Sequence, residues 1–450
     1  MPGGRRAPQH TESRKRAANR ARTCATVVHQ QIRIVLETGK PADRILAAFF
    51  RQNRKFGSTD RRLISTLYFA VFRWWGWLQH IVPDPTRPID PHTTTGLAVL
   101  YGACLLDDVP ASSILPIWRD ELKHDYDLPK ETPQRTDCLV QSAKSLSRFF
   151  RMVPDSLQPR SLLPEWIWDN LPANCDHDRL IAICQQRPPL WLRAQGGSRE
   201  ALVTDLKAHG FKPQISETVD AALALRDARP NLYELSEFTD GRFEVQDLAS
   251  QVIGLVCAAE PKQRWWDACA GAGGKSLQLA SMMANTGTVV ATDIREYKLL
   301  ALKKRSRRGR LHNIRTRAWK GRAIPVQAAN FDGVLVDAPC TCSGVWRRSP
   351  DARWTTPPTE VQKISELQAD ILQRAAAGVR PGGCLVYATC SLCTGENEAV
   401  IRQLLETNSA FTLDPTPHPL TGEATDGTIR VWPYDADCDG VFVARLRRTE

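Results

Sequence analysis

The chain lacks any long apolar run and any segment of the kind that directs export. No stretch of its 450 residues approaches the roughly 18 consecutive apolar residues that are needed to cross a bilayer. The first residues, MPGGRRAPQHTESRKRAANRART, contain no apolar core of a secretory signal. With 42% hydrophobic and 24% charged residues, the composition is that of a globular protein. We therefore expect a cytoplasmic protein without a membrane partner, and the length predicts two or three domains.

Nothing in the cysteine pattern indicates a disulfide framework, although the chain contains 13 cysteines. They are scattered along a long sequence that has no export signal, so we expect free thiols in a reducing compartment. Most should be small buried side chains, and a few should be reactive or bind a metal. The cysteines that cluster in the C-terminal half are the ones of interest.

Acidic residues are absent from one long internal stretch. Residues 303–322 contain ten basic side chains and no acid, and residues 1–24 contain seven basic side chains and one acid, within a formal net charge of +11. Positive charge concentrated in this way suits a polyanionic partner such as a nucleic acid. The internal stretch favours RNA binding, whereas residues 1–24 fit a disordered tail equally well.

The hydrophobic pattern divides the remaining chain into three parts. Residues 25–150 read as a helical domain, with stripes such as Leu63, Leu67, Val71 and Trp74 on one helix face. The aromatic run FRWWGW fits a helical core better than a surface that stacks bases. Residues 151–245 read as linker helices and a small α+β unit, in which RPPLWLRAQ is a strand and SREALVTDLKAHG a helix. In residues 246–450 strands and helices alternate, which predicts an α/β domain with a doubly wound, mostly parallel sheet.

A glycine turn follows the first strand of that sheet. The sequence DACAGAGGK, residues 267–275, lies between the strand RWWDACA and the helix KSLQLASMMA. Nineteen residues after Gly274, Asp293 ends the next strand, where a carboxylate can accept the ribose hydroxyls of a nucleoside. A phosphate-binding P-loop would need glycine where Cys269 stands, and a dinucleotide site would need glycine or alanine where Ser276 stands. A purely structural turn remains the alternative.

Two further strands end in cysteine motifs. FDGVLVDAPC places Asp337 and Cys340 after one strand, and GCLVYATCS places Cys390 after another. Both strand ends should face the ligand crevice of a doubly wound sheet. A thiolate that adds to C6 of a pyrimidine makes C5 nucleophilic towards a methyl donor, and a base must then remove the C5 proton. Two cysteines and Asp337 supply a nucleophile, an acid/base group and a polar contact to the base.

Other readings of these cysteines remain open at this point. Cysteines at buried strand ends are usually inert. The pairs Cys340/Cys342 and Cys390/Cys393 could also form a four-thiolate zinc site. The first pair lacks the usual two-residue spacing, so we expect no metal.

These motifs make the sequence similar to the RsmB/Sun/Nop type of RNA cytosine-C5 methyltransferase, and most similar to the bacterial RsmB group. CAGAGGK, VVATDI, VLVDAPCTCSGVWRRSPDARW and YATCSLCTGENE match motifs of that family in the expected order. The resemblance covers nearly the whole chain. It implies a Rossmann-like class I methyltransferase domain in residues 246–450, a ferredoxin-like unit within residues 151–245, and a NusB-like RNA-binding domain in residues 25–150.

The resemblance also implies roles for individual residues. Cys390 would be the nucleophile, Cys340 would assist its release, and Asp337 would lie beside the methyl donor and the target base. S-adenosylmethionine would be bound by Asp337 and Asp293 together with the glycine turn: Cys269, Ala270, Gly271, Ala272, Gly273, Gly274 and Lys275. Arg348, Pro350, Asp351 and Arg353 match a family segment beside the site.

The sequence departs from the family pattern at three places. Ala272 stands where the family usually has proline. The family usually has an acid after the third strand, near the adenine, whereas no acid occurs here between Glu296 and Asp332. The DAPCSG motif is extended to DAPCTCSG, which adds Cys342.

The sequence thus predicts a methyltransferase that forms 5-methylcytosine in RNA, with ribosomal RNA as the expected partner. A DNA cytosine-C5 methyltransferase is the alternative within enzymes, since its nucleophile also follows proline, as Cys340 does. The alternative outside enzymes is a non-catalytic RNA-binding or assembly factor on the same fold. The intact Cys340, Cys390 and Asp337 disfavour that reading, whereas the missing acid favours it.

Overall fold

The computed structural model describes residues 8–82, 84, 88–111, 113–122, 157–226 and 231–449. The chain forms two compact units. The helical unit comprises Met1–Asp169, Asn174–Arg187 and Trp346–Pro357, and the sheet unit comprises Asn170–Ala173, Pro188–Val345 and Pro358–Glu450. Each unit is therefore built from segments that are separated in the sequence.

The helical unit is formed by amphipathic helices that bury the predicted stripes. Leu63, Leu67, Val71 and Trp74 are all buried, and so are the aromatic side chains of FRWWGW, which confirms that this run is core. A Cβ on Gly76 would lie 2.0 Å from the carbonyl oxygen of Ser161, so glycine is required where these two segments touch. The helices are α1 (Pro8–Thr38), α2 (Ala42–Gln52), α3 (Ser58–Leu78), η1 (Gln79–Ile81), α4 (Thr94–Leu106), α5 (Leu115–Leu122), η3 (Pro159–Leu162), η4 (Glu165–Asn170), α7 (His177–Cys184) and α13 (Ala352–Thr355).

The N-terminal residues differ from the predicted tail. α1 begins at Pro8, so the chain is helical from there through residue 24, where a disordered arm was expected. Alanine and arginine are good helix formers, and they make up eight of the twelve residues 14–25, so local propensity favours a continuous helix. The helical pattern predicted towards residue 150 passes beyond α5 into residues 123–156, which lie outside the described part.

The segment Trp346–Pro357 completes the helical unit from far along the chain. The guanidinium of Arg353 is buried and donates to the carbonyl oxygens of Arg73 (3.2 Å), Trp346 (3.3 Å) and Cys184 (2.5 Å). The Asp351 carboxylate accepts a hydrogen bond from the backbone N–H of Ala42 at 2.9 Å. These residues, which match a family motif, are structural members of the helical core.

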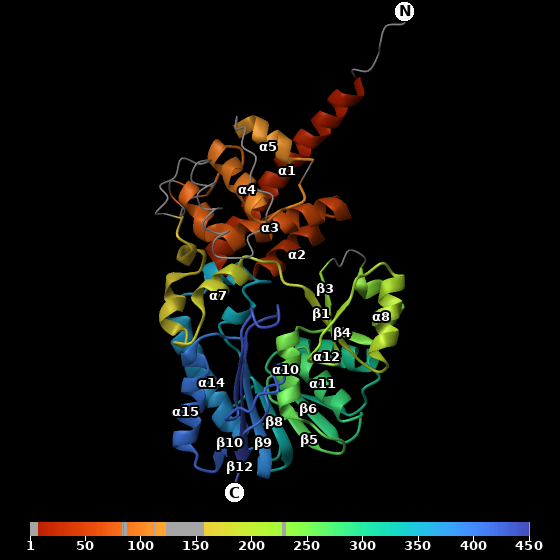
Figure 1. Cartoon of the computed structure of the whole chain (residues 1–450), viewed down its shortest axis with the longest axis vertical. Coiled ribbons are helices and arrows are strands. Elements are labelled where there is room, and N and C mark those ends of the chain that lie inside the picture. Colours follow the sequence, from red (N-terminus) through yellow and green to blue (C-terminus); the bar gives the residue numbers. More distant parts are fainter. Residues whose placement is uncertain are drawn as a thin grey trace, which may run out of the picture. The chain divides into compact units, whose positions relative to one another are not determined.

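The sheet unit contains a small antiparallel sheet that follows the predicted α+β pattern (Figure 1). Its strand order is β2-β3-β1-β4, and every pair is antiparallel, which is the topology of a ferredoxin-like unit. The elements are β1 (Leu190–Ala194), α8 (Arg199–Ala208), β2 (Gln214–Ile215), β3 (Ala222–Leu225), η5 (Leu232–Glu234), α9 (Ser236–Thr239) and β4 (Phe243–Val245).

The large sheet has the predicted doubly wound form. Its order is β10-β12-β9-β8-β5-β6-β7, with β11 paired to β12. Five consecutive strands of this order, β9-β8-β5-β6-β7, are parallel to one another. The remaining strand pairs are antiparallel: β12 with β9, β10 and β11. The strands are β5 (Arg264–Asp267), β6 (Thr288–Asp293), β7 (Ile314–Ala318), β8 (Phe331–Asp337), β9 (Val379–Thr389), β10 (Phe411–Leu413), β11 (Thr428–Val431) and β12 (Val441–Arg448).

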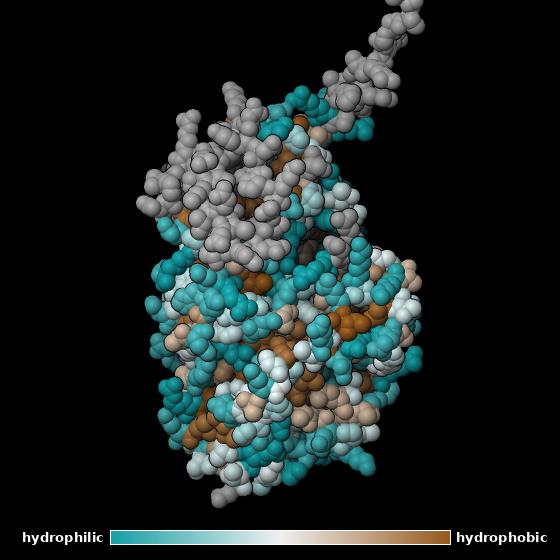
Figure 2. Space-filling model, viewed as in Figure 1, coloured by the Kyte–Doolittle hydropathy of each residue, from teal (hydrophilic) through white to brown (hydrophobic). Residues whose placement is uncertain are grey.

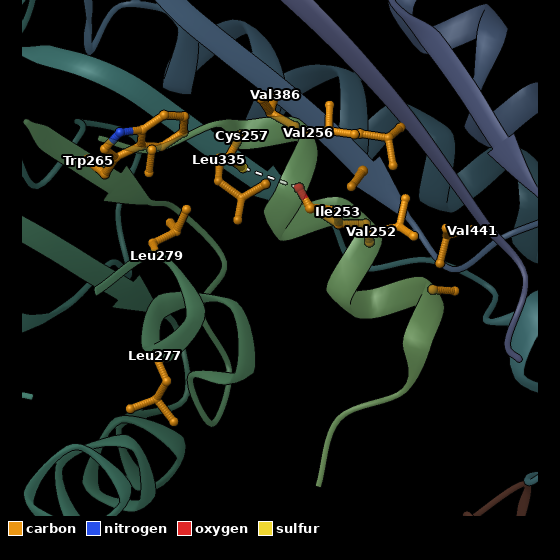
Figure 3. Packing of buried hydrophobic residues seen from close by; sticks show 14 of the residues in the cluster. Val252, Ile253, Val256, Cys257, Trp265, Leu277, Leu279, Leu335, Val386 and Val441 are labelled. Carbon is orange, nitrogen blue, oxygen red and sulfur yellow. Dashed lines mark hydrogen bonds between the residues drawn. The ribbon is translucent and has the colours of Figure 1, made fainter. Parts of the chain in front are cut away.

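Helices cover both faces of this sheet. In Figure 1, α10 (Leu248–Cys257), α11 (Gly274–Met282) and α12 (Glu296–Arg308) lie on one side, and α14 (Glu360–Ala376) and α15 (Glu398–Thr407) on the other. Each side has its own apolar core, one around Val252, Leu277 and Val386 and the other around Trp266, Leu372 and Tyr387. Figure 3 shows the first core, in which α10 packs its apolar side chains towards the strands.

The exterior of the sheet unit is mixed in polarity. On the face visible in Figure 2, hydrophobic patches are interspersed with hydrophilic side chains. Within the described residues, every helix is too short or too polar to span a bilayer.

Candidate active site

The glycine turn joins β5 to α11 at the carboxyl end of the sheet. Gly271 and Gly273 have φ values of 52° and 85°, which glycine adopts without the strain of a side chain. A Cβ on Gly273 would lie 2.0 Å from Leu302 Cδ1 of α12. Beside it, a Cβ on Gly274 would meet no atom within 4 Å, so the start of α11 is open. The turn therefore exposes backbone N–H groups at a helix N-terminus, which suits a negatively charged ligand group.

The Asp293 carboxylate ends β6 directly beside this turn. It is buried and accepts hydrogen bonds from the backbone N–H of Gly271 at 2.8 Å and from the backbone N–H of Arg295 at 2.8 Å. The Arg295 guanidinium donates to both carboxylate oxygens, at 2.9 and 3.0 Å. Burial alone would raise the pKa of Asp293, but the hydrogen bonds from Arg295 and Gly271 hold this pKa below its ordinary value. The carboxylate is thus ionised, and the half-exposed Arg295 guanidinium covers both of its oxygens.

The region at the end of β7, where the family pattern would supply an acid, reads Arg317-Ala318-Trp319-Lys320. The Trp319 ring packs against Trp266 with a centroid distance of 5.3 Å, and its backbone N–H donates to the carbonyl oxygen of Asp293 at 3.2 Å. The next residue, Lys320, pairs with Glu296 at the start of α12. This corner of the site is therefore built from a buried ring and an ion pair.

Lys275 of the glycine turn pairs with Asp337 at the end of β8. Lys275 Nζ lies 2.7 Å from Asp337 Oδ2. Burial alone would lower the pKa of Lys275, but the charge of Asp337 and the hydrogen bond to it raise that pKa above its ordinary value. Cys390 is also close enough to interact electrostatically with the Lys275 ammonium. The predicted donor-binding lysine therefore links the turn to both other motifs.

The two predicted catalytic cysteines lie together. Because β8 and β9 are parallel neighbours with Asp337 paired to Ala388, the loops that follow them meet at one edge. The Sγ atoms of Cys340 and Cys390 are 3.3 Å apart. Hydrogen bonds to Cys342 and Cys390, together with burial, raise the pKa of the Cys340 thiol well above its ordinary value. Cys340 is therefore held as the protonated thiol in this arrangement.

The additional cysteine of the DAPCTCSG loop joins this pair. Cys342 has a left-handed φ of 58°, and its Sγ lies 3.8 Å from that of Cys340. The thiols of Cys340, Cys342 and Cys390 all lie within 4.8 Å of one another. The Cys393 thiol instead contacts the Ser343 hydroxyl at 3.8 Å. Among the described residues, the four cysteines of the zinc alternative thus do not form one cluster.

One buried carboxylate next to the cysteines was not identified from the sequence. Glu396 is fully buried and accepts hydrogen bonds from the residues that follow the two cysteines, Thr341 and Ser391. Its place in YATCSLCTGENE, six residues after Cys390, is the one signal in the sequence, because a carboxylate that is buried beside a cysteine needs hydrogen-bond donors. Its partner Thr341 is 55 residues away, however, so only the fold reveals the contact.

The basic stretch lies mainly on α12 and β7. Arg305 and Arg308 pair with the buried Glu244 of β4, so these two are structural and are not available to phosphates. The other eight basic residues of the stretch are exposed: Lys303, Lys304, Arg307, Arg310, Arg315, Arg317, Lys320 and Arg322.

The sheet order, the glycine turn and the carboxylate of Asp293 define an S-adenosylmethionine-dependent class I methyltransferase. The residues fit this methyl donor, because an open helix N-terminus and a buried ionised carboxylate stand side by side.

This domain is similar to the RsmB/F family. Residues 255–447 match the family model of the 16S rRNA methyltransferase RsmB/F. A Synechocystis protein named "Probable ribosomal RNA small subunit methyltransferase B" is 26% identical over 420 residues, which cover 88% of this chain and 93% of that protein. The ribosomal RNA small subunit methyltransferase B of Pasteurella multocida is 31% identical over 302 residues, which cover 64% of this chain and 66% of that protein.

Solved structures agree with the fold. The crystal structure of PH0851 is similar with a TM-score of 0.72 at 23% identity, covering 95% of this chain and 99% of that one. NSun6 from Pyrococcus horikoshii, solved with SFG, gives a TM-score of 0.51 at 20% identity, covering 59% of this chain and 92% of that one.

Proposed function

We propose that this protein methylates carbon 5 of cytosine in ribosomal RNA of the small subunit. The observation that carries the proposal is the 3.3 Å separation of the Cys340 and Cys390 thiols beside the Lys275–Asp337 ion pair. A methyltransferase acting on nitrogen or oxygen has no need for two adjacent thiols, whereas addition to C6 of a pyrimidine requires one nucleophile and one proton-transfer group. The names of the relatives from Synechocystis and Pasteurella multocida add the substrate class.

The proposed reaction begins at Cys390. Its thiolate, next to the Lys275 ammonium, adds to C6 of the cytosine, and the displaced electron pair makes C5 nucleophilic. S-adenosylmethionine supplies the methyl group to C5. Cys340 then takes up the C5 proton, and the electrons of that C–H bond restore the double bond as Cys390 leaves C6.

Because the two sulfurs are close, the charge on Cys390 controls whether Cys340 is protonated at each step. While Cys390 is a thiolate, its charge and hydrogen bond favour the protonated form of Cys340. Once Cys390 is bonded to carbon, that charge is gone, so the partly exposed Cys340 thiol loses its proton to solvent and can act as the base for the C5 proton. The same pair can therefore hold a proton before addition and accept one afterwards.

Asp337 and Lys275 would orient the base. The N4 amino group of cytosine is a hydrogen-bond donor, which a carboxylate accepts. Burial raises the pKa of Asp337, and the Lys275 ammonium, 2.7 Å away, opposes that rise. Asp293 and residues 269–275 would hold the donor, with the Arg295 guanidinium moving aside for the ribose.

RNA binding is assigned to the exposed basic residues of the stretch 303–322 and to the helical unit, which we propose to be NusB-like. Phosphate contacts position an RNA without reading its sequence.

A non-catalytic assembly factor is the second candidate, because Arg295 covers the Asp293 carboxylate and the chain has no acid between β7 and Asp332. Incubating the protein with labelled S-adenosylmethionine and small-subunit ribosomal RNA from cells that lack this gene tests both candidates. We expect label in 5-methylcytosine, located by bisulfite sequencing, and none with Cys390→Ser. Absence of donor binding in the folded protein would favour the assembly factor.

A further inference from the structure

We infer that Glu396 is a positioning residue that holds the Cys340 loop against Cys390, so that its loss blocks the release of the RNA and spares covalent addition. This inference rests on the proposed function, and it assigns a role to a side chain that touches neither thiol.

The Glu396 carboxylate connects the two cysteine loops. Its Oε1 accepts from the hydroxyls of Thr341 and Ser391, each at 2.5 Å. Its Oε2 accepts from the Thr341 backbone N–H at 2.9 Å and from Gln368 Nε2 of α14 at 3.0 Å. A carboxylate has about four acceptor positions, so this set satisfies it fully. Because Thr341 follows Cys340 and Ser391 follows Cys390, one buried group fixes the spacing of both thiols.

The Cys390 side of this connection has other supports. Cys390 follows β9, whose last residue Thr389 accepts from the Ser391 backbone N–H at 3.1 Å through its hydroxyl. Asn397 Nδ2 donates to the Ser391 carbonyl oxygen at 2.9 Å. Removal of Glu396 therefore leaves Cys390 anchored by its strand and by Asn397.

The Cys340 loop is tied to the Cys390 loop farther along, where Gly344 N–H donates to the Cys390 carbonyl oxygen at 2.9 Å and the Ser343 hydroxyl accepts from Leu392 N–H at 2.7 Å. Directly beside Cys340, at Thr341, it depends on Glu396. Both the backbone N–H and the hydroxyl of Thr341 donate to this carboxylate, and Gln368 bridges it to the carbonyl oxygen of Pro339, 2.8 Å away. Loss of Glu396 leaves the buried N–H of Thr341 without this acceptor, and the loop must shift to find another. A shift of about 1 Å in a catalytic group can slow its step about a hundredfold.

The experiment measures the covalent protein–RNA complex that resists denaturant. Wild-type protein and the variants are incubated with S-adenosylmethionine and small-subunit ribosomal RNA from cells that lack this gene, and the adduct is followed with time on a denaturing gel. Cys340→Ser is the reference that should trap RNA. Glu396→Ala should trap RNA although both cysteines are present, with release about a hundredfold slower than in the wild type.

Two further variants should give amounts of trapped RNA between those of the wild type and Glu396→Ala. Thr341→Val keeps the side-chain shape and the backbone N–H bond but removes the hydroxyl, so it should trap RNA to a smaller extent. It also keeps the test decisive if Glu396→Ala does not fold. Glu396→Gln should release RNA faster than Glu396→Ala, because its carbonyl can still accept from Thr341 N–H and Gln368.

Glu398 provides the matched control. It lies two residues away, is 38% exposed in its side chain and pairs with Arg430 at 2.6 Å, so Glu398→Ala should behave as the wild type. If Cys340→Ser traps RNA while Glu396→Ala and Thr341→Val form no more adduct than the wild type, the inference is wrong. If Cys340→Ser itself traps nothing, the two-cysteine reaction fails and the proposed function falls with it.

Discussion

The thiols of Cys340 and Cys390 are 3.3 Å apart, although 50 residues separate them in the chain. The pairing of β8 with β9 brings their loops together, so the two groups that the chemistry needs are supplied by adjacent strands. The Cys340 thiol also contacts that of Cys342 at 3.8 Å, so three thiols lie within 4.8 Å of one another.

The roles of these two cysteines should separate in single variants. Cys390→Ser should be inactive and form no adduct, since the step that attaches RNA is lost. Cys340→Ser should accumulate a denaturant-resistant complex that disappears on ribonuclease treatment, since only release is lost. The reversed pattern would make Cys340 the nucleophile and support DNA-type chemistry.

Loss of Asp293 should weaken donor binding. Hydrogen bonds to a charged group contribute about 1.5–3 kcal/mol, so Asp293→Ala should reduce affinity for S-adenosylmethionine by that amount in calorimetry. Asp220→Ala, at a fully exposed carboxylate in the ferredoxin-like unit, is the control and should bind as the wild type. Equal affinities in a folded Asp293→Ala protein would remove Asp293 from the donor site.

The exposed basic residues of α12 and its C-terminal turn should contribute to the salt dependence of RNA binding. Phosphate contacts release counterions, so neutralising Lys303, Lys304, Arg307 and Arg310 should weaken binding and flatten its slope against salt concentration. Neutralising four other exposed residues gives the same change of net charge: Lys207, Lys212, Lys363 and Arg402. If both quadruple variants alter the slope equally, only net charge matters.

We expect no tightly held zinc at the clustered cysteines. Three thiols converge and Cys393 faces Ser343, whereas structural zinc sites use four ligands. Elemental analysis of protein purified without added metal is the direct measurement. One zinc per chain, with activity lost on chelation, would contradict the two-cysteine mechanism.

Stability should depend on pH through Asp267 of β5. Burial raises the pKa of Asp267 from 3.8 to about 7, and Ser276 is its hydrogen-bond partner at 2.5 Å. Between these values the folded protein holds a proton that the unfolded chain releases, so the free energy of unfolding should fall as pH rises through this window. Urea titrations at pH 4.5 and 7.5 should show a smaller fall for Asp267→Asn than for the wild type. Equal falls would mean that Asp267 titrates normally.

Local patterns were sufficient to predict the sheet and which of the candidate residues its strand ends bring together. The strands that end at Asp267, Asp293, Asp337 and Thr389 were predicted because apolar runs precede turn residues, and a parallel sheet necessarily brings such ends together. The segments expected as strand RPPLWLRAQ and helix SREALVTDLKAHG are found as β1 and α8. Periodicity also identified the buried stripe of α3.

What could not be predicted depends on contacts between distant residues. The sequence near Glu244 does not indicate that this carboxylate pairs with Arg305 and Arg308, which lie 61 and 64 residues away. The pairing makes these two arginines unavailable to phosphates. The sequence likewise gives no sign that the Arg295 guanidinium covers the Asp293 carboxylate. Charged side chains choose partners by the fold, so sequence alone overestimates how many of them are available to a ligand.

The segment Trp346–Pro357 has a consequence for the order in which the protein matures during translation. The helical unit is otherwise complete at Arg187, yet the buried site that Arg353 fills stays empty until about 160 more residues have been added. At typical rates of synthesis this is a delay on the order of ten seconds. During that interval the carbonyl oxygens of Arg73 and Cys184 lack their guanidinium, so the nascent helical unit should be loosely packed and open to proteases. The first part of the chain to be synthesised would thus be among the last to become fully native.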